Sequence, residues 1–171
     1  MPALVSAIDG DVEISRWLEL IPQPYRAREA REWVETATSG WRDGTLGALA
    51  VCDAQGGDVF GGIGLRVRAA DDRVAEIGYW AAARSRGRGA TTRAVALLSR
   101  WALDEAGAER VQLRAELENV ASQRVAEKAG FVREGVLRSY RFNPRLGRRM
   151  DFVMYSLLPA DVGPVRDGEL P

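Results

Sequence analysis

Residues 74–115 hold the feature that most limits the possible folds, namely a strand, a glycine-rich loop, a helix and another strand in direct succession. The apolar run 74–80 predicts the first strand. Arg86-Gly87-Arg88-Gly89 leads into a helix whose apolar residues recur at helical spacing over 94–102. Apolar and polar residues then alternate over 111–115, as on a strand with one buried face. This order and spacing predict a crossover unit within one sheet.

Further helices and strands are predicted around this unit. Helical periodicity is patchy from Leu4 to Leu20, and the Pro-containing segment Ile21–Tyr25 then breaks it. A clearer helix runs from Arg26 to Gly40, with one face made of Ala30, Trp33, Val34 and Ala37. A short helix over 122–129 stops at Gly130, and further strands are predicted at 45–52, 59–67, 131–136 and 151–158. We therefore expect a mixed α/β (α+β) fold with a central sheet.

The composition excludes several classes of function. With 24 Lys and Arg against 24 Asp and Glu, no global field attracts nucleic acid or an anionic membrane. The absence of histidine and the single cysteine, Cys52, remove the usual zinc sites, histidine-based triads and any internal disulfide. No apolar run has membrane-spanning length and no secretory segment opens the chain, so we expect a cytoplasmic protein. We expect one domain over 1–159 and a flexible tail over 160–171.

The loop Arg86-Gly87-Arg88-Gly89-Ala90-Thr91 has the residue types of a phosphate-binding site. A loop that enters a helix places unpaired backbone N–H groups at one point, where the helix dipole adds positive potential. Glycine at 87 and 89 lets the backbone approach a ligand closely, and Arg86 and Arg88 add charged donors. A turn that serves packing alone is the alternative. The loop matches neither a Walker motif nor the dinucleotide-binding fingerprint.

Five segments of the sequence form a larger pattern. They are Glu76-Ile77-Gly78-Tyr79-Trp80, Arg86-Gly87-Arg88-Gly89, Asn119-Val120-Ala121-Ser122, Glu127-Lys128-Ala129-Gly130-Phe131 and Glu134-Gly135. In order and spacing they resemble the GNAT acetyltransferases, and more narrowly the branch of the Rim-type ribosomal-protein N-terminal acetyltransferases. The resemblance covers about residues 12–158. It implies a mostly antiparallel sheet that is splayed between its fourth and fifth strands and flanked by helices.

The start of the chain departs from this family. Relatives open with a strand before the first helix, and this strand is missing after Met1-Pro2-Ala3-Leu4. Either the sheet lacks its edge strand or the start codon is assigned late. An exposed edge would favour association, and we expect a monomer or a homodimer.

The resemblance implies acetyl-CoA as the acyl donor, with no metal. The strand end Tyr79-Trp80-Ala81 is expected to bind the pantetheine arm through its backbone, and an N–H there to stabilise the oxyanion. The loop 86–91 is expected to hold the pyrophosphate. Arg86 and Gly89 match the family's pattern, Thr91 departs from it, and a register two residues earlier is the alternative. Asn119 matches a position that holds the cofactor arm, with a helix N-cap as the alternative.

Three residues are candidates for proton transfer. Glu76 is the candidate general base, acting directly or through water, with a salt bridge as the alternative. Ser122 matches a position proposed to protonate the leaving thiolate, with helix capping as the alternative. Tyr140 is a candidate proton donor or else a wall of the acceptor groove. The family's other acid and base positions do not transfer, because they are occupied by Arg114, Arg141 and Ala126.

The function implied is direct acetyl transfer to a primary amine, with a protein N-terminus as the leading acceptor. A small amine is the alternative acceptor. A non-catalytic acyl-CoA sensor and a general nucleotide-binding module are the other classes. The acceptor groove is expected near the aromatic side chains Trp17, Tyr25, Trp33, Trp41 and Tyr140.

Overall fold

The computed structural model describes residues 1–19, 21–55, 57–69 and 71–163, and the chain divides into two compact units. The first unit contains residues 1–66 and 78–91, and the second contains 67–77 and the residues from 92 onward. The single domain over 1–159 stays a prediction. Of the predicted tail, a 3₁₀ turn at Pro159–Asp161 is described, and 164–171 lie outside the described residues.

Six strands form one sheet in the order β1-β2-β3-β4-β6-β5. β3 and β4 pair in parallel, whereas β1 with β2, β4 with β6, and β5 with β6 pair antiparallel. The helix α4 (Ala90–Asp104) connects the two parallel strands, as the predicted crossover requires. The strands are β1 (Leu46–Cys52), β2 (Val59–Ala69), β3 (Val74–Ala81), β4 (Arg110–Glu116), β5 (Val132–Asn143) and β6 (Arg148–Leu157). The mixed α/β fold is therefore confirmed.

The parallel ladder between β3 and β4 is shorter than either strand. It runs from Val74 opposite Arg110 to Ile77 opposite Leu113. β3 nevertheless extends to Ala81 and β4 to Glu116. When the family's first strand, which is missing here, is included in the count, β3 and β4 become the fourth and fifth strands. The splay is predicted between these two strands. In the described part of the chain, helices and no strand precede β1.

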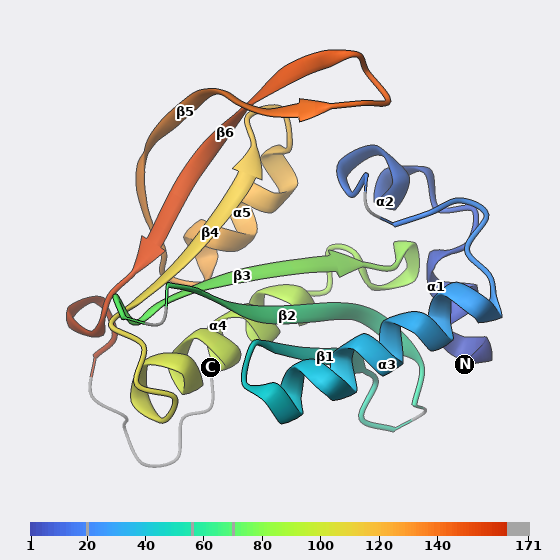
Figure 1. Cartoon of the computed structure of the whole chain (residues 1–171), viewed down its shortest axis with the longest axis horizontal. Helices are drawn as coiled ribbons and strands as arrows, with labels where there is room; N and C mark the ends of the chain where they lie inside the picture. Colours follow the sequence, from blue (N-terminus) through green and yellow to red (C-terminus); the bar gives the residue numbers. More distant parts are fainter. Residues whose placement is uncertain (20, 56, 70, 164–171) are drawn as a thin grey trace. The chain divides into compact units, whose positions relative to one another are not determined.

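The first unit holds α1 (Pro2–Ile8), α2 (Val12–Trp17) and α3 (Ala27–Asp43). Figure 1 shows α3 running along β1. The prediction that Gly40 ends this helix is wrong, because α3 continues to Asp43 and Gly44 ends it with a φ of 68°. Gly40 is buried, and a Cβ there would lie 2.7 Å from the Cβ of Leu46. The absence of a Cβ at Gly40 thus allows α3 to approach β1 closely.

The face predicted for α3 is partly wrong. Ala30 and Ala37 are buried and Trp33 is half-buried, as expected, but Val34 is exposed. The buried stripe is therefore narrower than the sequence pattern suggests.

None of the described helices has the length and apolarity needed to cross a membrane.

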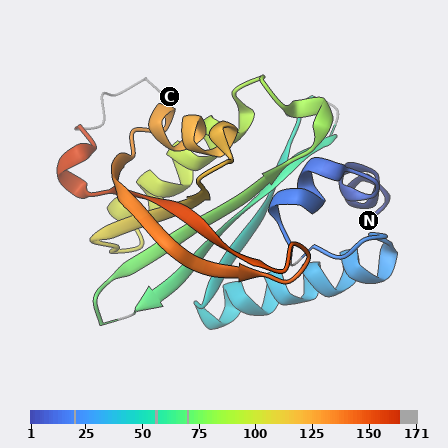
Figure 2. The same cartoon turned by 90° about the horizontal axis from the view of Figure 1, so that it is seen from above.

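The second unit contains most of α4, then β4, α5 (Val120–Lys128) and the β5–β6 hairpin, whose long twisted ribbon Figure 2 shows in orange and red. Val111, Leu113 and Ala115 are buried in alternation along β4, as predicted. The predicted boundary of the next strand at 136 is wrong, because β5 continues to Asn143. Pairing with β6 extends it through polar residues, with a register shift between Leu137 and Arg141.

Ser99 on α4 is fully buried, and its hydroxyl has no hydrogen-bond partner among the described residues. An unpaired buried hydroxyl destabilises a fold. We expect Ser99→Ala to raise the free energy of unfolding by about 1 kcal/mol, measured by urea denaturation. Ser156 is the matched control, because its buried hydroxyl donates to Glu134 at 2.8 Å. Ser156→Ala should lower the same free energy, and equal effects of the two variants would contradict this account.

Arg110 and Glu134 form a bidentate ion pair, with both N–O distances 2.7 Å. The Arg110 hydrogen bond, assisted by that of Ser156, outweighs burial and lowers the pKa of Glu134 to about 2. A lowered carboxyl pKa stabilises the folded protein at pH values above 4.5, the usual pKa of the group. This contribution is lost as the pH falls towards 2.

We expect Glu134→Gln to lower the free energy of unfolding at pH 7 by less than about 1 kcal/mol, because both side chains are partly exposed. The difference from wild type should shrink below pH 4.5 and vanish near pH 2. Urea denaturation at several pH values measures it. A difference that stays constant with pH would contradict the pKa shift.

Candidate active site

The predicted phosphate loop lies where the sequence analysis expects it, at the start of a helix. After β3 ends at Ala81, a 3₁₀ turn spans Ala83–Ser85 and the 15-residue α4 begins at Ala90. Gly87 and Gly89 both have a φ of 76°. This left-handed conformation is accessible to glycine and strained for residues with a Cβ. The conformation therefore accounts for glycine at both positions, and the first N–H groups of α4 lack acceptors within the helix.

The turn before the loop is fixed to β2. Ser85 is buried, and its hydroxyl lies 2.5 Å from the carbonyl oxygen of Phe60. Arg84 donates to the carbonyl of Val59 at 3.0 Å, and the N–H of Ala82 donates to Phe60 at 2.9 Å. These bonds hold the start of the loop in one position relative to β2.

Arg86 forms an ion pair with Asp11, a residue that was not among the predicted site residues. Its guanidinium donates to Oδ2 of Asp11 at 2.6 Å and to the carbonyl of Ala81 at 3.0 Å. Oδ1 of Asp11 accepts from the N–H groups of Glu13 and Ile14 and so caps α2. Burial raises the pKa of Asp11, but the bonds from Arg86 and from the α2 amides outweigh it, and the net pKa is lowered. The cap signal of Asp11 is visible in the sequence, whereas its pairing with Arg86 is not.

The end of β3 packs closely against β2 through two glycines. A Cβ on Gly61 would collide with the carbonyl oxygen of Trp80, and a Cβ on Gly62 would collide with the Trp80 indole. Both glycines are buried. Because both residues lack a Cβ, the Trp80 carbonyl and indole can pack directly against the β2 backbone.

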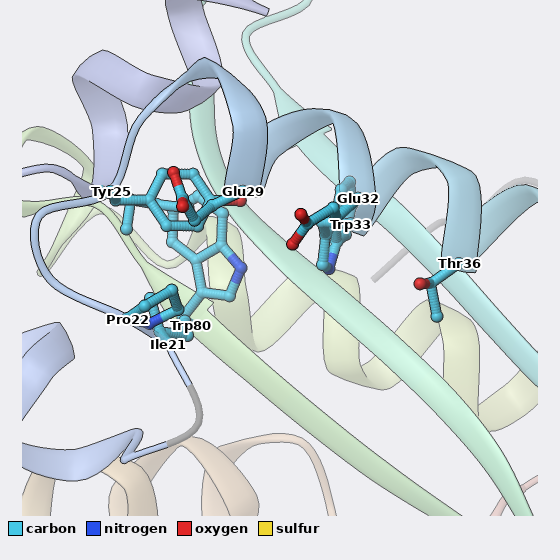
Figure 3. Close-up of a pocket in the computed structure, with 9 residues that line it drawn as sticks. Ile21, Pro22, Tyr25, Glu29, Glu32, Trp33, Thr36 and Trp80 are labelled. Carbon is cyan, nitrogen blue, oxygen red and sulfur yellow. The ribbon is translucent and has the colours of Figure 1, made fainter.

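A cavity of about 280 Å³ lies in the first unit, with Trp80 as part of its wall. Figure 3 shows the lining residues, and those on α3 follow one another along the helix. Three aromatic side chains, Tyr25, Trp33 and Trp80, contribute to the wall, and the others are Ile8, Ile21, Pro22, Glu29, Glu32 and Thr36. Burial, with a contribution from the charge of Glu29, raises the pKa of Tyr25, so the phenol stays neutral. The cavity has an apolar wall with two carboxylates.

The aromatic residues expected around the acceptor divide between different surroundings. Tyr25 and Trp33 line this cavity, and its identity as the acceptor groove stays a prediction. Trp41 instead donates from its indole nitrogen to the carbonyl of Ala48, and Trp17 donates to Glu13. Tyr140 belongs to the second unit. The stripe formed by 29, 32, 33 and 36 was not predicted, although its i, i+3, i+4, i+7 spacing marks one helical face.

In the second unit, Asn119 caps α5. Its Oδ1 accepts from the N–H of Ser122 at 3.0 Å. The structure thus brings these two candidates together and shows the capping arrangement considered as the alternative. A role of either side chain towards acetyl-CoA stays a prediction.

Glu76 lies in a group of basic and polar side chains in the second unit. It accepts from both Arg114 and Gln112, the latter at 3.0 Å, and Arg68 lies 3.6 Å away. Gln112 and Arg114 share one face of β4, and Gln112 is opposite Glu76 in the parallel register. Arg114 also stacks on the Tyr140 ring, with 4.7 Å from Cζ to the ring centroid. Arg114 therefore connects the candidate base with the candidate acid.

These contacts bear on the roles of both candidates. The salt bridge considered for Glu76 is present, and Tyr140 lies over a guanidinium rather than alone on the surface. Neither observation decides the proton transfers, which stay predictions. Among the described residues, no cluster of three or more His, Cys, Asp or Glu side chains could hold a metal ion.

The fold and the loop define a class of protein. β3 extends beyond its parallel ladder with β4 and leads through a glycine-rich loop into α4. The five sequence segments that resemble the GNAT family imply this arrangement. The family model described as "Acetyltransferase (GNAT) domain" matches residues 1–132. The chain belongs to the GNAT acetyltransferases and is an acyltransferase, which confirms the predicted family and enzyme class.

Individual relatives agree with this assignment. The Bacillus subtilis (strain 168) protein named "Putative ribosomal N-acetyltransferase YdaF" is 32% identical over 153 residues, which cover 88% of this chain and 81% of that protein. A T. thermophilus crystal structure described as a "putative acetyltransferase" has 31% identity and a TM-score of 0.76, covering 94% of this chain and 81% of the other. The first name agrees with the predicted Rim-type branch.

A third relative shows the same fold at lower identity. It is a Vibrio cholerae structure described as a "putative ribosomal-protein-serine acetyltransferase". It has a TM-score of 0.76 at 20% identity and covers 92% of this chain and 87% of the other. The predicted GNAT fold is thereby confirmed.

Proposed function

We propose that the protein transfers the acetyl group of acetyl-CoA to a primary amine by direct attack, and that the acceptor is the N-terminal amine of a protein or peptide. The observation that carries the proposal is the passage from the end of β3 through Arg86–Thr91 into α4. It offers strand backbone and the first N–H groups of a helix along one continuous stretch of chain. The name of the B. subtilis relative supports a protein acceptor.

Each candidate residue has a role in this scheme. The backbone of Tyr79, Trp80 and Ala81 binds the pantetheine arm, and Arg86, Gly87, Arg88, Gly89, Ala90 and Thr91 bind the pyrophosphate. Asn119 holds the cofactor arm. The amine nitrogen forms a bond to the thioester carbonyl carbon and loses its proton to Glu76, directly or through water. The carbon–sulfur bond then breaks, and Ser122 or Tyr140 protonates the CoA thiolate.

A thiol-release assay with acetyl-CoA tests the acceptor. We expect turnover with peptides that have a free N-terminus and none with the same peptides blocked at the N-terminus. Glu76→Gln should lower kcat by about 100-fold or more if Glu76 is the base. Turnover with small amines and none with peptides would overturn the N-terminal assignment.

A small primary amine is the second candidate acceptor. The specific observation in its favour is the cavity volume of about 280 Å³. This is slightly below the range of roughly 300–1,000 Å³ found for small-molecule sites. The same assay, run with alkyl and aryl-alkyl amines beside the peptides, separates the two candidates.

A further inference from the structure

The cavity beside Trp80 has a wall that suits an apolar group with a positive charge. Its aliphatic part consists of Ile8, Ile21 and Pro22, and its aromatic part consists of Tyr25, Trp33 and Trp80. Aromatic faces attract ammonium and guanidinium groups through the ring quadrupole. The wall therefore accepts both the apolar body of a ligand and a cation attached to it.

The two carboxylates at the cavity differ in how far they are already paired. Glu29 accepts from Nε and Nη2 of Arg28 at 3.0 and 2.8 Å and from the N–H of Arg26 at 2.9 Å. Its side chain is only 11% exposed. The Glu29 carboxylate thus serves the start of α3 and is committed within the protein.

Glu32 is placed differently. Its ion pair with Nε of Arg28 is long, at 3.9 Å, and its side chain is 64% exposed. Arg28 is thus shared between two carboxylates and sits closer to Glu29. Of the two carboxylates in the lining, Glu32 is therefore the one placed to pair with a charged ligand.

The position of Trp80 connects this cavity with the acetyl donor. The Trp80 side chain lines the cavity, and its backbone belongs to the strand end for which we propose thioester binding. A group bound in the cavity would therefore contact Trp80, whose backbone is proposed to lie beside the reacting thioester. This inference rests on the proposed function, because it concerns the acceptor of the same reaction.

We propose that the cavity selects acceptors that carry an ammonium group on an apolar body about the size of one large side chain, with Glu32 as the charge partner. In a peptide acceptor, this body is the side chain of the first residue. Acceptors with a carboxylate or phosphate close to the amine are disfavoured, because that anion would meet the charge of Glu32.

Calorimetry in the absence of acetyl-CoA tests the selection with two probes of similar shape. Phenethylammonium carries the cation, and 3-phenylpropionate carries an anion in its place. We expect the wild-type protein to bind phenethylammonium at least tenfold more tightly than 3-phenylpropionate. Equal affinities, or no binding of the cation, would overturn the proposal.

Substitutions at Glu32 locate the effect. Glu32→Gln should weaken binding of phenethylammonium about two- to fivefold, as expected for an exposed charge pair. Glu32→Lys should weaken it further and should improve binding of 3-phenylpropionate. Glu35→Gln is the matched control, because Glu35 lies on the same helix and does not line the cavity. Glu32 variants that bind like the control would overturn the role of Glu32.

The calorimetric test of the binding preference does not depend on turnover, so its failure can be distinguished from failure of the proposed function. If the cation binds through Glu32 but no amine is acetylated, the proposed function fails and the binding preference stands. If peptides are acetylated but first residues with large apolar side chains have no lower KM than glycine, the proposed function stands and the selection is overturned. Glu32→Gln should raise KM for the preferred acceptors and leave kcat unchanged.

Discussion

Gly87→Val is expected to weaken the binding of acetyl-CoA by about tenfold or more. The wild-type glycine has a φ of 76°, a conformation that strains a β-branched residue. The loop would shift to relieve this strain, and under the proposed function at least one backbone N–H would no longer reach a phosphate oxygen. A hydrogen bond to a charged group contributes about 1.5–3 kcal/mol, which corresponds to roughly 10- to 150-fold in affinity. Calorimetry with acetyl-CoA measures the change.

Gly107→Val is the control for backbone strain alone. Gly107 follows α4 with a φ of 70°, and like Gly87 it has open space where a Cβ would stand. Both variants should lose a similar free energy of unfolding, on the order of 1–2 kcal/mol. Only Gly87→Val should lose affinity for acetyl-CoA. If both variants bind acetyl-CoA like the wild type, the loop is a packing turn and the phosphate assignment is wrong.

Gly61→Ala is expected to lower the free energy of unfolding by about 3 kcal/mol, at the upper end of overpacking effects. The new Cβ would collide with the carbonyl oxygen of Trp80 and lie 3.3 Å from the Cα of Ala81. These are backbone atoms, which cannot move aside as a flexible side chain can. Thermal unfolding should show a Tm lower by about 6–12 °C.

Gly64→Ala on the same strand separates crowding from the change of residue type. A Cβ there would find its nearest neighbours, in Gly47 and Leu46, at 3.7 Å, an ordinary contact distance. We expect a change within about 0.5 kcal/mol. If Gly61→Ala and Gly64→Ala were equally stable, the close packing of β2 against Trp80 would be refuted.

Much of the fold follows from local patterns. The alternation at Val111, Leu113 and Ala115 predicts a strand with one buried face, and all three are buried. The end of helical structure before the prolines at 22 and 24 also has a local cause. Such features depend on neighbours in the sequence, and the sequence analysis places them correctly.

The errors arise where tertiary contact overrides local preference. Glycine usually marks the end of a helix, but Gly40 serves the approach of α3 to Leu46 and the helix continues. Likewise, β5 extends beyond 136 because β6 supplies hydrogen-bond partners for a polar stretch. Neither partner can be identified before the fold is known.

The candidate site shows the same division. The loop at Arg86 is predictable because glycine spacing and helix position are written in one short segment. The pairing of Arg86 with Asp11 and the contacts among Glu76, Arg114 and Tyr140 join residues far apart in sequence. The contacts of the proton-transfer candidates are therefore less predictable from the sequence than the position of the loop.

The ion pair between Asp11 and Arg86 would couple the proposed anion binding at the loop to proton uptake. Arg86 helps to keep the pKa of Asp11 low, so a polyanion that draws on the same guanidinium raises that pKa again. Protonation of Asp11 would in turn release Arg86 and favour the anion. Affinity for an anionic ligand should thus increase as the pH falls towards the pKa of Asp11. Ionic strength and pH would then both act on the proposed anion site through the same two side chains.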